Sequence, residues 1–178
     1  MRRLIPGLLL CALALFSITP SADGAEAGGK APEFALRDLD NNEVKLSSFE
    51  GNVVLISFWA TWCGPCMVEM PHLQKLHDTY KDQGFVLLTI NADDSKSSSR
   101  VKPLVKSKGF TFPVLLDTQT KVVNQYNPSK TLPYMELLDP QLNVIWRHQG
   151  YTPGDEVETE ARVKEAIAAL AASKVTPQ

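Results

Sequence analysis

A nearly unbroken apolar run, Val53–Trp59, ends shortly before a pair of cysteines, Cys63 and Cys66. Runs of this kind, rich in β-branched and aromatic residues, are typical of strands that are buried on both faces of a sheet. From Cys63 to Asp82 apolar residues recur at helical spacing, and Gly84 then ends the predicted helix. The chain therefore has to turn from a central strand directly into a helix, and both cysteines lie at that turn.

The segments on either side of this unit alternate between strand and helix patterns. Two short alternating segments around Asp40–Asn42 predict an N-terminal β-hairpin, because asparagine favours the turn. Strands that alternate with helices indicate an α/β fold in which a central mixed sheet carries helices on both faces. The predicted elements are a hairpin over 33–39 and 43–46, a strand over 53–59, a helix over 63–82, a strand over 85–91, a helix over 95–107 that is broken or restarted at Pro103, a strand over 112–116, a helix over 119–126, a hairpin over 135–138 and 142–147, and a helix over 155–172.

The last of these helices is amphipathic. We expect its apolar side to pack on the sheet and residues 175–178 to fray beyond it. The pattern contains no internal repeat and no second domain, so residues 28–174 are predicted to form one domain, which is large enough to bury a full core. The predicted apolar side consists of Val157, Ala161, Val163, Ile167 and Leu170.

The N-terminal residues have the three parts of a secretory signal. Arg2 and Arg3 give the positive start, residues 4–18 the apolar stretch, and Ala25–Ala27 an A-x-A cleavage site. The apolar stretch is shorter than the ~20 residues that a membrane span needs. We therefore predict that residues 1–27 are a cleaved signal peptide, with an uncleaved membrane anchor as the alternative. The leader is of bacterial type, which predicts a location in the periplasm or at the outer face of the cytoplasmic membrane, where conditions are oxidising.

The charge balance excludes a general nucleic-acid or polyanion binder. Lysine and arginine total 18 and aspartate and glutamate total 20, for a formal net charge of −2, so no basic excess is available to neutralise phosphates.

Of the 3 cysteines, Cys11 lies inside the leader's apolar stretch and follows leucines rather than a small residue. We interpret it as an inert leader residue and not as a lipid attachment site. The mature chain then holds one cysteine pair and no other thiol.

The turn from strand to helix suits a redox-active cysteine. The thiolate is the nucleophile, and free backbone N–H groups and the helix dipole would stabilise a negative sulfur on Cys63 at a helix N-terminus. In C-x-x-C proteins this setting lowers the thiol pKa from ~8.5 to between about 3.5 and 7.5. The spacing lets Cys66 close a disulfide across the first turn. We predict that Cys63 attacks a partner disulfide and that the more buried Cys66 resolves the mixed disulfide.

Two other uses of the cysteine pair stay open on spacing alone. A structural zinc site needs four ligands, but no second C-x-x-C occurs, and His72 and His77 do not share a helical face. A merely structural disulfide would add little stability through chain entropy, because the loop it closes is so small. Both alternatives are weaker than the redox role, and we predict no metal site.

Three separate segments resemble the thioredoxin superfamily. The segment VVLISFWATWCGPCMVEMP resembles its active-site strand and helix and is most similar to the TlpA/ResA-like thiol-disulfide oxidoreductases. APEFALRDLDNNEVKLSSFEGNVVLISFW resembles the N-terminal hairpin and lead-in of this AhpC/TSA–Redoxin-like branch, which the peroxiredoxins share, and TLPYMELLD resembles the superfamily's cis-proline segment. The likeness spans residues 30–172, and it implies a thioredoxin-like fold with an added N-terminal β-hairpin.

The resemblance also implies a substrate-docking surface around the cysteines. It assigns Pro133 as the proline whose preceding peptide bond is cis, the one kind of bond in which cis costs little. It implies that the backbone of Leu132 faces the first sulfur and hydrogen-bonds an extended substrate as a short added strand. Trp62, Gly64 and Pro65 complete the implied docking surface.

Glu69 comes three residues after Cys66 and therefore lies on the same side of the predicted helix. In the TlpA/ResA-like branch a glutamate here tunes the cysteine pair and can take a proton from the buried thiol, so the resemblance implies that role; a solvent-facing glutamate is the alternative. Burial near the sulfurs should raise its pKa. Thioredoxins have an aspartate at the position of Ser57, and this departure favours the extracytoplasmic branch.

Two rival functions have related sequence patterns. Peroxiredoxins use P-x-x-x-T-x-x-C, whereas Thr61 stands only two residues before Cys63 and residues 57–60 contain no proline. Sco-type copper-binding modules carry C-x-x-x-C with a distant histidine, and the spacing here is one residue shorter. A peroxiredoxin-type antioxidant and a Sco-like copper module are therefore the alternative functions.

The two residues between the cysteines bear on the direction of electron flow. Gly64-Pro65 is the thioredoxin dipeptide, which goes with a potential near about −270 mV, against about −120 mV for the oxidant DsbA. We therefore predict a reductant of protein disulfides that needs no cofactor beyond the Cys63–Cys66 disulfide. A reductant in an oxidising compartment needs an electron supply, for which the resemblance implies a CcdA/DsbD-like membrane donor. Apocytochrome c is one client within the family's range.

Overall fold

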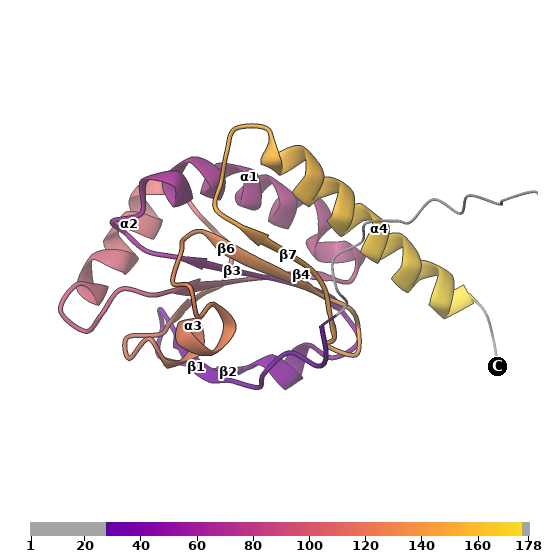
Figure 1. The fold of residues 1–178 in the computed structure, drawn as a ribbon, viewed down its shortest axis with the longest axis horizontal. Coiled ribbons are helices and arrows are strands. Elements are labelled where there is room, and N and C mark those ends of the chain that lie inside the picture. The colour runs from indigo at the N-terminus through magenta and orange to yellow at the C-terminus, as the bar shows by residue number, and fades with distance from the viewer. Residues whose placement is uncertain (1–27, 176–178) are drawn as a thin grey trace, which may run out of the picture.

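The computed structural model describes residues 28–175, whose strands form one seven-stranded sheet in the order β2-β1-β5-β4-β3-β6-β7 (Figure 1). The strands are β1 (Ala35–Asp38), β2 (Glu43–Lys45), β3 (Val53–Trp59), β4 (Phe85–Asn91), β5 (Val114–Leu116), β6 (Tyr134–Leu138) and β7 (Val144–Gln149), and the α-helices are α1 (Gly64–Tyr80), α2 (Val101–Lys108), α3 (Lys121–Tyr126) and α4 (Asp155–Val175). The predicted signal peptide, residues 1–27, lies outside the described residues. Of the predicted frayed tail, Val175 still belongs to α4 and residues 176–178 lie outside the described residues.

β3 lies inside the sheet and is buried along its whole length. It pairs in parallel with β4 and antiparallel with β6. Its side chains alternate between the faces, so Val53, Leu55 and Trp59 join the core on one face. Ile56 and Phe58 join the core on the other face. A strand with a core on either side has no solvent-facing position, which explains why its sequence is a continuous apolar run.

Helices cover both faces of the sheet (Figure 1). The buried residues of α1, α2 and α4 belong to the core on one face, and those of α3 and of the 3-10 helix η1 (Leu46–Phe49) belong to the core on the other. β3, β4 and β5 run parallel, while the remaining pairs are antiparallel. The predicted α/β fold with a mixed sheet is confirmed. Among the helices of residues 28–175, none is long and apolar enough to cross a membrane.

The predicted hairpin and the strand–helix–strand unit are also confirmed. β1 pairs with β2 antiparallel around a turn in which Asn41 has φ +67°, a conformation that asparagine tolerates. Gly84 ends the helical segment after α1 with φ +76°. The left-handed backbone conformation favours glycine there, and a Cβ atom at this position would also lie 2.9 Å from Cδ2 of Leu170 in α4, so the end of that side chain would have to move.

Two details of the helix predictions are wrong. α2 runs through Pro103 because this residue falls in the first turn, where a backbone N–H has no helical acceptor to lose. In α4, Val157 and Ala161 are exposed rather than packed on the sheet. The buried stripe runs through Thr159 and Val163 instead, and a residue two positions away lies about 200° around the helix.

Val163→Ala should lower the free energy of unfolding by roughly 2 kcal/mol, because this side chain is 1% exposed and its loss leaves a cavity against the sheet. Val157→Ala is the matched control in the same helix. Its side chain is 70% exposed, so the change should stay within about 0.5 kcal/mol. The gain in helix propensity is common to both variants. Urea unfolding of the oxidised protein measures both values, and equal destabilisation would contradict this packing of α4.

Candidate active site

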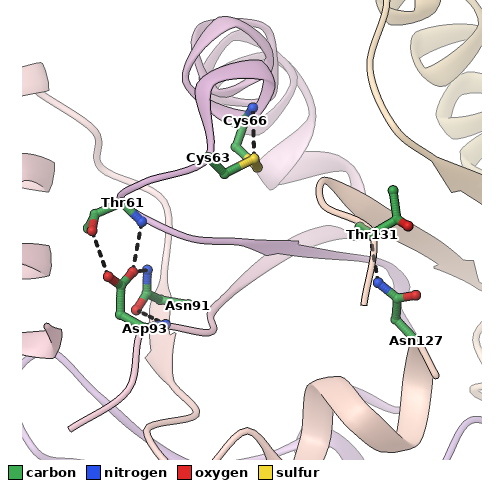
Figure 2. The surroundings of a disulfide bond; sticks show 7 residues. All are labelled: Thr61, Cys63, Cys66, Asn91, Asp93, Asn127 and Thr131. Atoms are coloured by element: carbon green, nitrogen blue, oxygen red, sulfur yellow. Dashed lines mark hydrogen bonds between the residues drawn. A yellow bond between two sulfur atoms is a disulfide. The ribbon is translucent and has the colours of Figure 1, made fainter. Parts of the chain in front are cut away.

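Cys63 and Cys66 form a disulfide where β3 leads into α1 (Figure 2). Their Cα atoms are 5.3 Å apart, a usual separation for a bridged pair. Cys63 is the N-cap residue of α1, and its Sγ accepts a hydrogen bond of 3.3 Å from the backbone N–H of Cys66. Pro65 lies in the first turn of α1, where backbone N–H groups make no bond within the helix, so the absence of an N–H costs nothing. The predicted position of Cys63 at a helix N-terminus is confirmed.

The two cysteines differ in their access to solvent. Cys66 is 0% exposed and Cys63 is 5% exposed, so a partner can approach only Cys63 without moving the helix. Gly64 and Pro65 are exposed beside it. The ring of Trp62 is 68% exposed, and tryptophan is a residue that protein partners commonly cover. The predicted exposure of Trp62 and the deeper burial of Cys66 are both found.

A buried carboxylate holds the loop that leads into Cys63. Asp93, which follows β4, accepts hydrogen bonds from the backbone N–H of Thr61 at 2.7 Å and from its hydroxyl at 2.6 Å. The side-chain amide of Asn91 donates to Asp93 at 2.8 Å and accepts from its N–H at 3.1 Å. Figure 2 shows these three side chains gathered at one side of the loop. They meet because parallel pairing places Trp59 opposite Asn91.

The proline loop lies at the same edge of the sheet. β3 and β6 are antiparallel with Phe58 opposite Tyr134, so the end of β3 and the start of β6 come together there. The Leu132–Pro133 peptide bond is cis, as predicted. The carbonyl of Pro133 accepts a hydrogen bond of 2.8 Å from the N–H of Gly150. The loop is thereby fixed at the point where it enters the sheet.

Leu132 presents unpaired backbone groups in this loop. Within residues 28–175, no loop or turn hydrogen bond uses its N–H or its C=O. The carbonyl of Thr131 accepts a bond of 2.7 Å from the side chain of Asn127, which in turn accepts one of 2.6 Å from Ser129. Figure 2 shows Asn127 and Thr131 across the disulfide from Asp93. A held segment with a free N–H and C=O can pair with an extended chain.

Glu69 lies in α1, one turn after Cys66, and its side chain is 2% exposed. Within the described residues, neither of its carboxylate oxygens has a hydrogen-bond partner. Burial, with a smaller effect from the negative charge of Asp155, raises the pKa of Glu69 from 4.5 to about 8. The predicted rise in pKa is confirmed, and the alternative of a solvent-facing glutamate is wrong. At neutral pH this carboxyl group holds a proton that it can exchange.

Two buried polar groups were not foreseen from the sequence. The first is Asp93 with its hydrogen bonds to Thr61; its only signal is that polar residues directly follow a buried strand, at the edge where functional groups of α/β sheets gather. The second is Glu136 in β6, which accepts hydrogen bonds from Tyr134 at 2.7 Å and Arg147 at 2.9 Å. Tyr134 belongs to the core on the α3 face, so this second group lies across the sheet from α1.

The histidine of β7 has a structural place. The Nε2 atom of His148 lies 3.1 Å from the carboxylate of Asp155 at the start of α4, and its ring stacks on Trp146 at 5.5 Å between centroids. Within residues 28–175, no group of three or more histidine, cysteine, aspartate or glutamate side chains could hold a metal ion.

Comparison with known proteins identifies the family. Residues 27–147 match the AhpC/TSA family. The chain belongs to this family. Within it, the chain is 35% identical over 141 residues to the thiol-disulfide oxidoreductase ResA of Bacillus subtilis (strain 168), which covers 78% of this chain and 77% of that protein. It is 41% identical over 112 residues to ResA of Geobacillus kaustophilus (strain HTA426), covering 63% of each. This AhpC/TSA family member is a ResA-like thiol-disulfide oxidoreductase with the Cys63–Cys66 pair.

Solved structures place the AhpC/TSA family member among thioredoxin-like folds. The crystal structure of a putative thiol:disulfide interchange protein DsbE from Chlorobium tepidum superposes with a TM-score of 0.73 at 30% identity, over 80% of this chain and 98% of that one. The solution structure of a putative protein disulfide isomerase from Bacteroides thetaiotaomicron gives 0.73 at 28% identity, over 80% and 90%. The thioredoxin-like fold implied by the sequence resemblance is confirmed.

Asp93→Ala should lower the free energy of unfolding by about 3 kcal/mol, because it leaves the N–H of Thr61 and the amide of Asn91 without their charged acceptor. Thr61→Val removes only the hydroxyl donor and should cost about 1 kcal/mol. Urea unfolding of the oxidised protein measures both. Loss of the same free energy in the two variants would show that Asp93 does not hold this loop.

The contribution of Glu69 to the free energy of unfolding should fall as pH rises between about 4.5 and about 8. The unfolded Glu69 ionises near pKa 4.5, whereas the folded one keeps its proton to about 8, so in this window the unfolded chain binds fewer protons. The Glu69 contribution falls by about 1.4 kcal/mol per pH unit there and is constant outside it. Glu69→Gln lacks this titration, so its stability relative to the wild type should grow with pH. Urea unfolding at pH 5 and pH 8 checks this; parallel profiles for the two proteins would contradict it.

Proposed function

We propose that this ResA-like protein is an extracytoplasmic reductant of protein disulfides that works through Cys63 and Cys66. The observation that carries the proposal is the position of Cys63 as N-cap of α1, with the N–H of Cys66 directed at its sulfur and Cys66 itself buried. A sulfur so placed is stabilised as the anion in the reduced protein. The cysteine pair is then the whole redox centre, with no further cofactor.

The reduced protein acts in two exchange steps. The thiolate of Cys63 attacks one sulfur of the substrate disulfide, and the other substrate sulfur leaves with the electron pair of the broken bond as a thiolate. The thiolate of Cys66 then attacks Sγ of Cys63, which closes the intramolecular disulfide and releases the second substrate thiolate. The substrate gains two electrons and the cysteine pair loses two.

The proline loop supplies a binding edge for the substrate chain. The free N–H and C=O of Leu132 would pair with an extended peptide at the edge of the sheet where β3 ends and β6 begins, and the bond from the N–H of Gly150 to the carbonyl of Pro133 holds the loop there. The exposed ring of Trp62, with Gly64 and Pro65, gives apolar surface that the substrate can cover. Backbone pairing of this kind selects extended chains rather than particular side chains.

Cys66 must lose a proton before it can attack, and we assign Glu69 as the acceptor. Glu69 follows Cys66 by one turn of α1 and is buried on the same side. Its pKa of about 8 is close to that of a free thiol, ~8.5. Only the ionised form of Glu69 can take this proton, and its share grows as pH rises toward about 8. Transfer between two groups of similar pKa is then nearly balanced.

The direction, location and partners follow from the leader and the family resemblance. Gly64-Pro65 favours a low potential and hence reduction of clients. A signal peptide over residues 1–27 would place the protein in the periplasm or at the extracytoplasmic face of the membrane, with membrane contact only if the leader stays as an anchor. We assign protein disulfides as substrates and a CcdA/DsbD-like membrane protein as the electron donor. Apocytochrome c is one candidate client, and nucleic acid is none.

Cys63→Ser should abolish reduction of insulin disulfides, because it removes the attacking sulfur. Cys66→Ser should accumulate mixed disulfides with protein substrates, because the attack still occurs and the resolving thiol is missing. Insulin precipitation and non-reducing gels give the two readouts. Cys11→Ser in the full chain is the matched control and should leave both unchanged.

Full turnover by the Cys66→Ser protein would overturn the roles assigned to the two sulfurs. The direction is checked separately by equilibrating the pair with thioredoxin or glutathione of known potential. We expect a value near about −270 mV, and a value above about −150 mV would contradict reduction as the direction.

A further inference from the structure

The loop that carries Leu132 is held at the residue on either side of it. On one side, the carbonyl of Thr131 accepts a hydrogen bond of 2.7 Å from Nδ2 of Asn127. On the other, the carbonyl of Pro133 accepts one of 2.8 Å from the N–H of Gly150. Leu132 itself is half-buried and makes no backbone hydrogen bond within the described residues. Its N–H and C=O are therefore unpaired on a backbone whose two neighbours are fixed.

Asn127 is anchored through both its backbone and its side chain. It directly follows α3 and is 2% exposed. Its N–H donates to the carbonyl of Val123 at 2.8 Å, and its C=O accepts from the N–H of Lys130 at 3.0 Å. Its Oδ1 accepts from the hydroxyl of Ser129 at 2.6 Å. Because the carbonyl of Thr131 can only accept, the amide nitrogen of Asn127 has to face it.

The bond to Thr131 determines where the next N–H points. The one cis bond within residues 28–175 is Leu132-Pro133, so the peptide group between Thr131 and Leu132 is trans. In a planar trans peptide group the C=O and the N–H point in opposite directions. Since Asn127 holds the carbonyl of Thr131 toward itself, the N–H of Leu132 points away from Asn127. A single side-chain hydrogen bond thus sets the direction of the N–H that the proposed function uses for docking.

That direction leads toward the face of the sheet on which Cys63 lies. The buried residues of α3, which Asn127 follows, belong to the core on one face, whereas Cys63 and the buried residues of α1 belong to the core on the other. The side chain of Leu132 packs against both cores, so this residue lies where the two faces meet. Figure 2 shows Asn127 on the side of Thr131 that faces away from the disulfide.

We propose that Asn127 is a positioning residue that aims the N–H of Leu132 at the substrate backbone and so makes the site selective for disulfides carried on an extended polypeptide. The inference rests on the proposed function. A substrate carbonyl that accepts from Leu132 gains a hydrogen bond that a small disulfide without a peptide backbone cannot make. Asn127 takes no part in the exchange of sulfur bonds and acts only through the loop.

Ser129 braces the same loop without setting this direction. Its hydroxyl donates to Oδ1 of Asn127 at 2.6 Å, and it accepts at 3.1 Å from the side chain of Gln149 in β7 and at 3.5 Å from the N–H of Thr131. Removing this hydroxyl leaves the bond from Nδ2 of Asn127 to the carbonyl of Thr131 in place. Ser129→Ala therefore separates general bracing of the loop from the aiming of one N–H.

Two probes with the same leaving group separate docking from chemistry. One is a capped, extended peptide of uncharged residues whose single cysteine carries an aromatic thiol through a disulfide. The other is the symmetrical disulfide of that aromatic thiol, which has no peptide backbone. With either probe the thiolate of Cys63 attacks one sulfur, and the aromatic thiolate leaves with the electron pair of the broken bond. This thiolate absorbs visible light, so stopped-flow absorbance with the reduced protein gives the second-order rate constant for each probe.

Asn127→Ala should slow the reaction with the peptide about tenfold, because the lost aim removes about one hydrogen bond to the substrate. The reaction with the aromatic disulfide should keep the wild-type rate, because the sulfur of Cys63 and its donor, the N–H of Cys66, are untouched. Asn127→Asp keeps the shape of the side chain and the acceptor for Ser129, but its carboxylate has no proton to donate to Thr131. At pH 8 it should show the same selective loss.

The readout is the ratio of the two rate constants, because a general loosening of the protein would slow both probes. Ser129→Ala should keep the wild-type ratio. Asn124→Ala removes the same kind of side chain from an exposed position of α3, where its amide lies 3.5 Å from the hydroxyl of Thr120. It is the matched control and should leave both rate constants unchanged.

A wild-type rate with the peptide in either Asn127 variant would overturn the proposal. So would an equal loss with both probes, or a selective loss in Ser129→Ala as large as that in Asn127→Ala, which would assign the effect to the loop as a whole. Failure of the proposed function looks different, because Cys63→Ser would then release the aromatic thiolate from the peptide as fast as the wild type. The two inferences can therefore be rejected independently.

Discussion

The hydrogen bond from the N–H of Cys66 to the sulfur of Cys63 is the contact on which the rest of the site depends. It exists because β3 ends only a few residues before α1 begins, so the cap position of the helix falls on Cys63. Pro65 in the first turn favours the start of a helix at this point. Asp93 fixes Thr61 two residues before the cap. Inserting one residue into this loop would put another side chain at the cap and leave the sulfur without its donor.

Both neighbours of β3 in the sheet, β4 and β6, place residues beside the loop between β3 and α1. Because β4 is parallel to β3, the end of β4 lies beside the loop and places Asp93 next to it. Because β6 is antiparallel to β3, the start of β6 lies beside the same loop and places Pro133 there. Neither neighbour could supply both groups. The central position of β3 and its two kinds of pairing thus bring three segments that are distant in sequence to one edge of the sheet, while the cores on its two faces keep that edge rigid.

What could be predicted from the sequence is what depends on local spacing or on a family-like motif. The apolar run of β3, the cap position of Cys63 and the burial of Glu69 all follow from the order of residues along one strand and one helix. The bond between Asp93 and Thr61 joins residues 32 positions apart and depends on the register of β3 against β4, which no local pattern contains. The predicted inward side of α4 was wrong at Val157 for a related reason. Small and apolar residues occur all around this helix, and only contact with the sheet determines which of them are buried.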